Sequence, residues 1–411
     1  MMSKKYVGVG YSSRSNGFMA GAEATRKAMD SGNISDPSFV LAFAANRTDS
    51  EEFLHGIQSV AGSNTPIAGG AAVGIITCEN LSYSETPSGV VVFDSALLKA
   101  KTAQVHDIDH DLNSAGMELI KELTPNEATK AILIFFDSML RPGNSDTPPS
   151  IPSSRPILQG IHSRLACDIP IFGAGMISDF ELSSSFILGK SGTGEKCMAG
   201  AALSGNFRVY STITHGSVLL DGIYHRITRQ QGAAVMELDG KPIVETINEI
   251  YGNDSWQKER PVTNLTLGIN NGPKFGEFDE DAYVNRLIVG PLPDKSGVIL
   301  FEEGPQAGDE IQFLQRDPIK TIESTREKTL SILDDIAKDG KRPVFALYID
   351  CAGRAASVSL TKSEEAAIVQ EAMGTAGIPL LGFYSGIEIA PIRGASRGLD
   401  WTGVLMMLAV D

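Results

Sequence analysis

The chain has 411 residues, of which 42% are hydrophobic and 21% are charged. This composition is typical of a globular protein of two or more domains, and it excludes a largely disordered chain or a small scaffold held by disulfides or metals. With 35 basic and 50 acidic residues the net charge is −15, so most of the surface would repel a nucleic-acid backbone. The apolar runs are too short to span a bilayer and no signal peptide is recognisable, so we expect a cytoplasmic protein without nucleic-acid or membrane partners.

One pattern recurs three times along the chain: a continuous apolar run, an amphipathic segment, and a second apolar run containing Pro-x-x-Gly. Apolar runs of this length are typical of strands buried on both faces, and the segments between them have helical spacing. The pattern therefore predicts three strand-helix-strand units. They occupy 37–47, 50–61 and 65–69; 131–141, 156–166 and 169–173; and 343–354, 364–373 and 378–382.

The segments between these units predict further strands, two helices and several turns. Helices are expected over 243–251 and 318–338, and Gly189–Lys196 is expected to be a hairpin turn rather than a phosphate loop, because no Lys-Ser or Lys-Thr follows its second glycine. The runs 298–301 and 310–313 predict a hairpin, and the proline-rich stretch 141–156 predicts an exposed loop. Strands are expected over 90–93, 199–203, 208–213 and 233–237.

These elements predict an α/β protein of two domains, built from repeated strand-helix-strand units in mixed sheets with helices on the outside. We place the break between the halves within 228–262 and divide the chain into domains 1–228 and 229–411.

Several stretches, in order along almost the whole chain, resemble the FIST family of paired N- and C-terminal sensory domains. The segments that resemble the family are Gly8-Val-Gly10, Pro66–Gly74, Glu237–Pro242, Cys351–Arg354 and, most specifically, Pro379–Pro391. The resemblance implies sensing of a small ligand, with amino acids or similar metabolites as candidates. It also implies a histidine kinase or a cyclic-nucleotide signalling enzyme as partner, and the haem-binding nitric oxide sensor branch of the family as an alternative.

Charged side chains follow the first strand of each unit. Just beyond equivalent strands lie three arginines, Arg47, Arg141 and Arg354. Two aspartates, Asp137 and Asp350, follow their strands at the same offset. Ligands of open α/β sheets bind outside the carboxyl ends of strands, where arginine can bind a carboxylate or phosphate with two hydrogen bonds. The alternative is an arginine that ties a loop to a neighbouring aspartate.

A second group of polar residues follows the third Pro-x-x-Gly segment. Tyr384, Ser385 and Glu388 lie in or beside a glycine-bearing turn, and the carboxylate of Glu388 could accept an amine. A carboxylate facing an arginine would suit a zwitterionic amino acid. The alternative is a capped turn with surface side chains.

Other polar groups favour structural roles. Arg316 and Asp317 predict an internal ion pair. His106 and His110 flank two aspartates and could bind a metal, but an acidic helix start explains the pattern as well, and no metal is expected. No cofactor is expected either, although His55 or His162 could ligate a non-covalent haem.

The sequence thus predicts a non-enzymatic sensor that binds an amino-acid-like metabolite at strand ends and relays this to a separate signalling partner. The alternatives are a haem-binding nitric oxide sensor and an enzyme on a small polar substrate with Glu388 or Asp350 as base.

Overall fold

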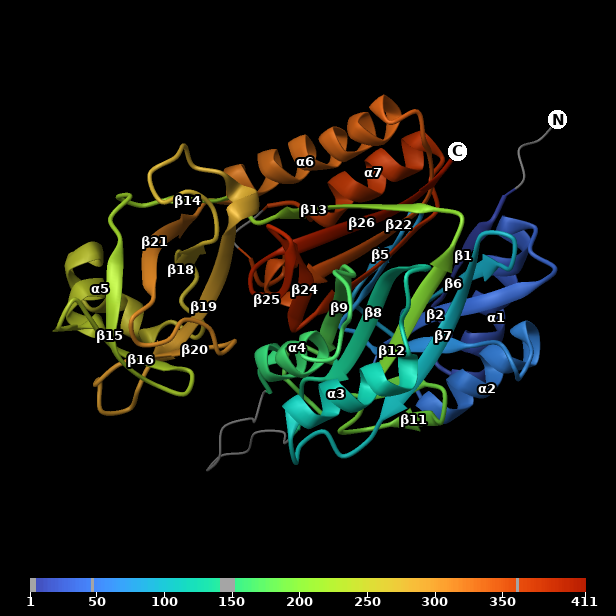
Figure 1. Ribbon diagram of the computed structural model, residues 1–411, viewed down its shortest axis with the longest axis horizontal. Helices are drawn as coiled ribbons and strands as arrows, with labels where there is room; N and C mark the ends of the chain where they lie inside the picture. Colours follow the sequence, from blue (N-terminus) through green and yellow to red (C-terminus); the bar gives the residue numbers. More distant parts are fainter. Residues whose placement is uncertain (1–4, 46–47, 141–151, 360–361) are drawn as a thin grey trace.

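The computed structural model describes residues 5–45, 48–140, 152–359 and 362–411. Three six-stranded sheets form the body of the molecule, and an eight-stranded sheet forms a separate lobe at one end (Figure 1). The lobe consists of residues 217–316, which leave the body after β13 and return to it at α6; we call this segment the insertion. The expected α/β class, with mixed sheets and helices outside them, is confirmed.

The body contains three units of identical element order: strand, helix, strand, helix and four further strands. The first unit consists of β1 (Val7–Ser12), α1 (Gly17–Gly32), β2 (Pro37–Ala44), α2 (Ser50–Ala61), β3 (Ile67–Ala71), β4 (Ile75–Thr77), β5 (Leu81–Ser82) and β6 (Ser88–Asp94). The second consists of β7 (Leu98–Val105), α3 (Leu112–Leu123), β8 (Thr129–Asp137), α4 (Ser154–His162), β9 (Ile171–Met176), β10 (Ile187–Gly189), β11 (Gly192–Gly194) and β12 (Met198–Gly205). The third consists of β13 (Arg208–Thr214), α6 (Pro318–Lys338), β22 (Arg342–Cys351), α7 (Ala366–Ala376), β23 (Leu380–Ser385), β24 (Ile387–Ile392), β25 (Ala395–Leu399) and β26 (Gly403–Val410).

Each unit donates one hairpin to the sheet of another unit, in a closed cycle. The hairpin β4–β5 of the first unit pairs with β23 of the third, β10–β11 of the second pairs with β3 of the first, and β24–β25 of the third pairs with β9 of the second. The sheets therefore share one strand order, with threefold pseudosymmetry: β1-β6-β2-β3-β10-β11, β7-β12-β8-β9-β24-β25 and β13-β26-β22-β23-β4-β5. The two halves of the chain are thus interlocked through backbone hydrogen bonds.

Each sheet packs one face against its own helices and the other against a common centre (Figure 1). Helices α1 and α2 cover the first sheet, α3 and α4 the second, and α6 and α7 the third. A central core draws side chains from all three sheets, among them Phe43, Phe135 and Phe383, and the rings of Phe43 and Phe383 stack with centroids 3.9 Å apart. The residues at the carboxyl ends of the central strands of the three sheets therefore lie close to one another.

The glycine of each Pro-x-x-Gly segment lies where the second parallel strand of a unit approaches the first. Gly69 and Gly173 have φ values of +145° and +158°, and an added Cβ would lie 1.9 Å from the carbonyl oxygen of Ala42 or 1.8 Å from that of Ile134. No side chain fits there, which explains why the motif recurs. In the third unit the Cβ at Gly382 would lie 2.8 Å from the carbonyl oxygen of Tyr348.

The insertion has its own core around Trp256 and Phe313, covered by α5 (Ile243–Tyr251). Its other elements are β14 (Ser217–Leu219), β15 (His225–Gln231), β16 (Ala234–Leu238), β17 (Lys241–Pro242), η1 (Ser255–Lys258), β18 (Leu265–Asn270), η2 (Glu280–Ala282), β19 (Tyr283–Pro291), β20 (Val298–Leu300) and β21 (Glu310–Arg316). The expected break at 228–229 falls within β15 and stays a prediction.

The three strand-helix-strand units are confirmed, with parallel pairing in each, as are the helices over 243–251 and 318–338 and the hairpin β10–β11. The hairpin expected from 298–301 and 310–313 is wrong. Strand β20 pairs with β16 and β19, whereas β21 pairs with β14, β15 and β18. The two strands are consecutive in sequence, but each pairs with other strands of the insertion. Most of the loop expected over 141–156 lies outside the described residues. Among the described helices, none combines the length and the apolar composition needed to cross a membrane.

Candidate functional site

Five of the seven residues expected to bind a ligand meet in one buried cluster at the carboxyl ends of β22 and β23. They are Asp350, Arg354, Tyr384, Ser385 and Glu388, and each is at most 1% exposed. Asp350 and Tyr384 pair in register across the parallel strands, which brings the two segments together although 34 residues separate them in sequence (384 − 350). The other two expected residues, Arg47 and Arg141, lie outside the described residues.

Arg354 is held at the centre of the cluster by the short helix η3 (Ala352–Arg354). Its guanidinium forms ion pairs with Glu365 and with Asp350, the Nε–Oδ1 distance to Asp350 being 3.2 Å, and Nη1 donates to the carbonyl of Trp401 across 2.6 Å. Burial alone lowers the pKa of Arg354, but the two carboxylates outweigh this and raise it. The arginine is therefore permanently charged and acts as a fixed cationic centre.

Asp350 is surrounded by more negative than positive charge. Burial raises the pKa of its carboxyl well above the usual range, Glu365 raises it further, and Arg354 only partly opposes them. Neither carboxylate oxygen of Asp350 makes a hydrogen bond with another described residue. Such a buried group is costly unless a proton, water or ligand satisfies it.

Glu388 breaks the pseudosymmetry of the central core. Each donated hairpin places one residue opposite the position that directly follows a Pro-x-x-Gly glycine. These three equivalent residues are Ile75, opposite Phe383; Ile187, opposite Gly70; and Glu388, opposite Ala174. The two isoleucines pack in the central core, so a carboxyl replaces a branched alkyl group at the third equivalent position.

The carboxyl of Glu388 is only half satisfied. Ser385 Oγ donates to Oε1 across 3.0 Å, whereas Oε2 has no hydrogen-bond partner among the described residues. Burial raises the pKa of Glu388 well above its usual range, and Asp400 adds to the shift. Burial also raises the pKa of Asp400, to about 7, against the opposing charge of Arg286.

Tyr384 connects the cluster to the molecular surface. Its hydroxyl donates to Oε2 of Glu364 across 3.0 Å, and Oε1 of the same carboxylate accepts from Tyr83 across 2.7 Å. Burial raises the pKa of Tyr384 well above its usual range, so the phenol stays a hydrogen-bond donor. Tyr83 belongs to the first unit, so this contact joins the two halves of the chain.

Asp137 does not share the place of Asp350, and the common offset read from the sequence is wrong. Asp137 pairs with Met176, three residues after Gly173 of its Pro-x-x-Gly segment. Asp350 pairs with Tyr384, only two residues after the equivalent Gly382. A shift of one residue turns a side chain to the opposite face of a sheet. Asp137 accordingly faces the central core, where it accepts hydrogen bonds from Ser185 and from the backbone of Met139 and Lys196.

The ion pair expected between Arg316 and Asp317 does not form within the part of the chain that the structure describes. The guanidinium of Arg316 stacks over Trp401, 3.6 Å from the ring centroid, and donates to the carbonyl of Thr263. Asp317 instead caps α6 by accepting from the backbone of Ile319 and Lys320. The two neighbouring side chains have different partners because Arg316 ends a strand and Asp317 caps the start of a helix.

Of the histidines, His215 touches this cluster, because its carbonyl accepts from Nη1 of Arg354 across 3.3 Å. Asp111 caps α3 just after His110, which agrees with the structural interpretation of that segment, and no group of three metal-ligating side chains occurs among the described residues. The side chain of His55 is 61% exposed, and His162 is exposed at the end of α4, where it lines a cavity. Neither histidine faces the enclosed apolar surroundings that bind haem, and haem binding stays a prediction.

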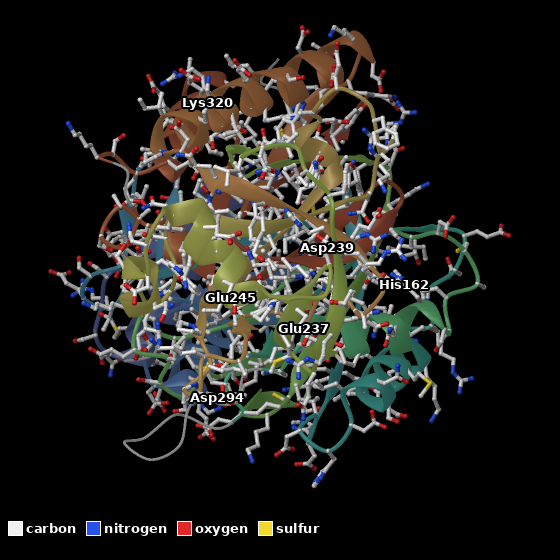
Figure 2. All side chains as sticks on the ribbon, turned by 90° about the vertical axis from the view of Figure 1, so that its left-hand side faces the viewer. His162, Glu237, Asp239, Glu245, Asp294 and Lys320 are labelled. Atoms are coloured by element: carbon white, nitrogen blue, oxygen red, sulfur yellow. The ribbon has the colours of Figure 1, made fainter. Side chains whose placement is uncertain are left out.

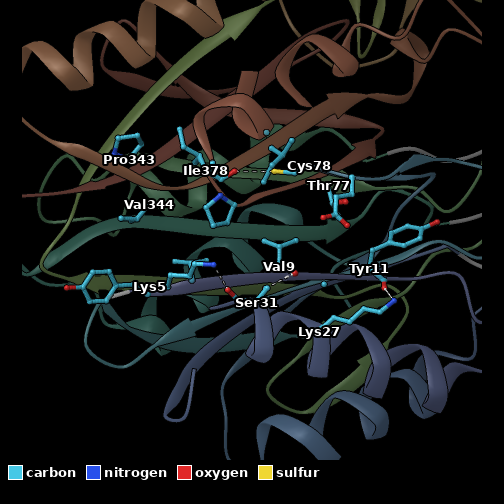
Figure 3. A pocket seen from close by; sticks show the side chains of 18 of the residues that line it. Lys5, Val9, Tyr11, Lys27, Ser31, Thr77, Cys78, Pro343, Val344 and Ile378 are labelled. Carbon is cyan, nitrogen blue, oxygen red and sulfur yellow. Dashed lines mark hydrogen bonds between the residues drawn. The ribbon is translucent and has the colours of Figure 1, made fainter. Parts of the chain in front are cut away.

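A wide groove of about 700 Å³ opens at the other end of the strands (Figure 3). It lies between β1 with α1 on one side and the amino ends of β22 and β23 on the other. Lys5 and Lys27 border it, but their ammonium groups donate to the carbonyls of Ser31 and Tyr11. The groove is a space between units, and two of its bordering cations, Lys5 and Lys27, already have partners.

Several members of the cluster were missed from the sequence. Glu364 and Glu365 precede α7 and could be read as an acidic helix start, while Asp400 and Trp401 lie in the turn before β26. The signal that could have indicated Glu365 is the presence of an arginine expected to be buried, which requires a carboxylate partner. Nothing local indicated Asp400.

The cluster combines one fixed cation, Arg354, with carboxyls whose pKa values are raised and whose oxygens are partly unsatisfied. Such a set can bind a carboxylate through arginine and an ammonium through a carboxyl that ionises on binding.

Comparison with known proteins supplies the family and little more. A family model described as the FIST N domain matches residues 38–241, and one described as the FIST C domain matches residues 244–391. An uncharacterized protein of Mycobacterium bovis is 27% identical over 191 residues, 46% of this chain and 48% of its own. An uncharacterized protein of Mycobacterium tuberculosis is 27% identical over 186 residues, 45% of this chain and 47% of its own. The match therefore spans about half the length of these curated relatives.

Among solved structures, PurLQS from Thermotoga maritima aligns over 98% of this chain and 73% of that chain, at 9% identity and a TM-score of 0.22. T. maritima PurL complexed with FGAR aligns over 98% and 72%, at 10% identity and a TM-score of 0.21. Scores this low support no inference about fold or function.

Proposed function

The chain belongs to the FIST family, whose N and C domains are small-ligand sensory domains of signalling proteins, and on this premise we propose that it binds an amino-acid-like metabolite in the strand-end cluster. Binding would occur inside the cell and would be relayed to a separate signalling partner, such as a histidine kinase or a cyclic-nucleotide signalling enzyme. The protein acts in this proposal by a shift between conformations, without turnover of its ligand.

The proposal rests on the presence of a glutamate, Glu388, at a position where the two pseudosymmetric equivalents are isoleucines. Stability alone favours the isoleucine, because a half-satisfied buried carboxyl costs free energy that an alkyl group does not. Retaining a carboxyl there is expected where it binds something. Arg354 supplies the opposite charge, so the cluster can receive both ends of a zwitterion.

The ligand reaches the cluster, in this proposal, past Tyr384 and Tyr83. Both phenols are held by the single carboxylate of Glu364, so a change at that carboxylate would move residues of both halves of the chain. Ligand binding can thereby alter the contact between halves, which is a physical route to a signalling partner.

The test begins with native mass spectrometry of freshly purified protein and a thermal-shift screen of the standard amino acids. We expect a retained small mass or a saturable stabilisation by one group of amino acids, with the ligand recovered unchanged. Glu388→Gln keeps the shape and the acceptor for Ser385 but removes the charge, and it should weaken binding by about tenfold or more, the usual scale for a charged hydrogen bond. Ile187→Val, at the equivalent position of the second hairpin, is the matched control and should bind normally.

Equal affinity of the Glu388→Gln variant and the parent protein would refute this site. Conversion of the ligand to a product would refute passive sensing and support an enzyme that uses Glu388 or Asp350 as base. A haem-sized mass would support the haem-binding alternative.

A further inference from the structure

A second cavity, of about 370 Å³, lies between the insertion and the second unit of the body. Its walls come from α4, from β25 and from the insertion at β19 and the turn after β20. Figure 2, which views the molecule from the end that carries the insertion, shows His162 of α4 beside the insertion; His162 also lines this cavity. The strand-end cluster described above contributes none of its five expected residues to these walls.

Three arginines from three separate elements line this cavity: Arg155 of α4, Arg286 of β19 and Arg397 of β25. Within the described residues none of them forms an ion pair with a carboxylate, in contrast to Arg354. All three side chains contribute to the lining of this one cavity. Like charges that share one cavity repel one another and favour binding of an anion, although the buried carboxyl of Glu302 also interacts electrostatically with Arg286.

The donors of these arginines are incompletely used. Arg286 is 6% exposed; its Nη1 donates to the carbonyls of Asn285 and Gly398, and its Nε has no hydrogen-bond partner among the described residues. Arg155 donates to the carbonyl of Gly304. The side chain of Arg397 is exposed and makes no hydrogen bond within the described part of the chain. Each guanidinium has five donors, so the cavity retains several for a ligand.

Acidic residues also line the cavity, and the most buried of them is engaged elsewhere. Glu302 accepts hydrogen bonds from Ser153 Oγ and from both the backbone and the hydroxyl of Ser154, and burial raises its pKa. Asp309 is exposed and accepts from the backbone of Gln306. With Glu303, three carboxyls accompany the three guanidiniums in the lining, so an anion would be held by the unused arginine donors and not by a net positive charge.

We propose that this cavity is a binding site for a small anion with two or more acidic oxygens, of the phosphate or dicarboxylate class, held by Arg155, Arg286 and Arg397. Planar guanidiniums bind both kinds of oxyanion with paired hydrogen bonds. Because Arg286 belongs to the insertion and the other two to the body, a bound anion would fasten the insertion to the body. This site is separate from the strand-end cluster and does not depend on the function proposed for it.

The experiment is calorimetric titration of the full chain with inorganic phosphate and, separately, with succinate, at neutral pH and constant ionic strength maintained with potassium chloride. We expect saturable binding of one anion per chain for at least one of the two probes, and the preferred probe identifies the ligand class. Arg397→Gln should weaken that binding by about tenfold or more, the scale of a charge-assisted hydrogen bond. The side chain of Arg397 is exposed, so this variant should fold normally.

Arg26→Gln is the matched control, because Arg26 is an exposed arginine on α1, away from the cavity, and the change in net charge is the same. It should bind the probe as the parent protein does, and so should Glu388→Gln. The proposal is overturned if the parent chain binds neither probe saturably. It is equally overturned if Arg397→Gln binds with unchanged affinity, or if Arg26→Gln weakens binding to the same extent.

Discussion

The hydroxyl of Ser385 donates to Oε1 of Glu388 across 3.0 Å, in a part of the core where neither side chain is exposed. Oε2 of the same carboxyl has no partner among the described residues, so the hydrogen bond offsets only part of the cost of burying the acid. The two donated hairpins that carry isoleucine at this position have no such cost. Glu388 is therefore a place where the central core departs from the repeated pattern of the fold.

We predict that Glu388→Ile stabilises the protein, by roughly 1 to 3 kcal/mol, because it replaces a half-satisfied acid by the residue that the equivalent hairpins use. Urea unfolding followed by circular dichroism measures the change. The reverse exchange in the second hairpin, Ile187→Glu, should destabilise the protein by several kcal/mol. A destabilised Glu388→Ile variant would show that the acid has a structural role that the geometry does not reveal.

Arg354 should be among the most sensitive positions for stability. Arg354→Met leaves Asp350 and Glu365 buried without their cation, and we expect a loss of about 3 to 5 kcal/mol. The double variant Arg354→Met/Glu365→Gln should recover part of this loss, because one of the stranded charges is removed. Arg26→Met, at an exposed site, should change stability by no more than about 0.5 kcal/mol. Additive losses in the double variant would contradict the ion pair.

The stability of the fold should depend on pH through Asp400. Its folded-state pKa of about 7 is raised from 3.8 by burial, so the folded chain holds a proton that the unfolded chain releases. The contribution of this group is therefore full below about pH 4 and is lost as the pH rises toward 7, with a slope of at most roughly 1.4 kcal/mol per pH unit.

Asp400→Asn should remove this dependence while keeping an acceptor for the backbone of Leu287, which Oδ2 contacts at 2.9 Å. Denaturant midpoints of both proteins between pH 4.5 and 7.5, with the difference plotted against pH, give the contribution of the residue. Parallel curves for the two proteins would mean that Asp400 does not titrate in this range.

The Pro-x-x-Gly glycines should tolerate no side chain. Gly173→Ala places a Cβ 1.8 Å from the carbonyl oxygen of Ile134 at a φ of +158°, and we expect a loss of more than about 2 kcal/mol or failure to fold. Gly374→Ala in α7 is the control, because the nearest atom to its added Cβ is 3.9 Å away. That exchange should be neutral or stabilise the protein by about 0.5 to 1 kcal/mol, through helix propensity. Equal effects at the two glycines would refute the steric argument.

The sequence by itself determined the repeated local structure. Apolar runs with a buried-strand pattern, helical spacing between them and the Pro-x-x-Gly segments identified all three strand-helix-strand units, and α5 and α6 were placed at their observed bounds. These signals suffice because periodicity and steric demands act within a few residues of one another. The ordered motifs also identified the family, which the family models confirm.

The sequence also selected Asp350, Arg354, Tyr384, Ser385 and Glu388, which the structure brings into one cluster. The parallel pairing of β22 with β23 explains why these residues lie together, since strand ends of one unit meet at one edge of a sheet. That they bind a ligand stays a prediction.

Only the tertiary structure decided the rest. The cyclic exchange of hairpins and the meeting of Arg155, Arg286 and Arg397 join residues far apart in sequence. The pairing of Arg354 with Glu365 and the register difference between Asp137 and Asp350 depend on how the strands and loops pack. Which partner a strand edge or a buried charge finds depends on the free energy of the whole packed chain, and no local pattern encodes that choice.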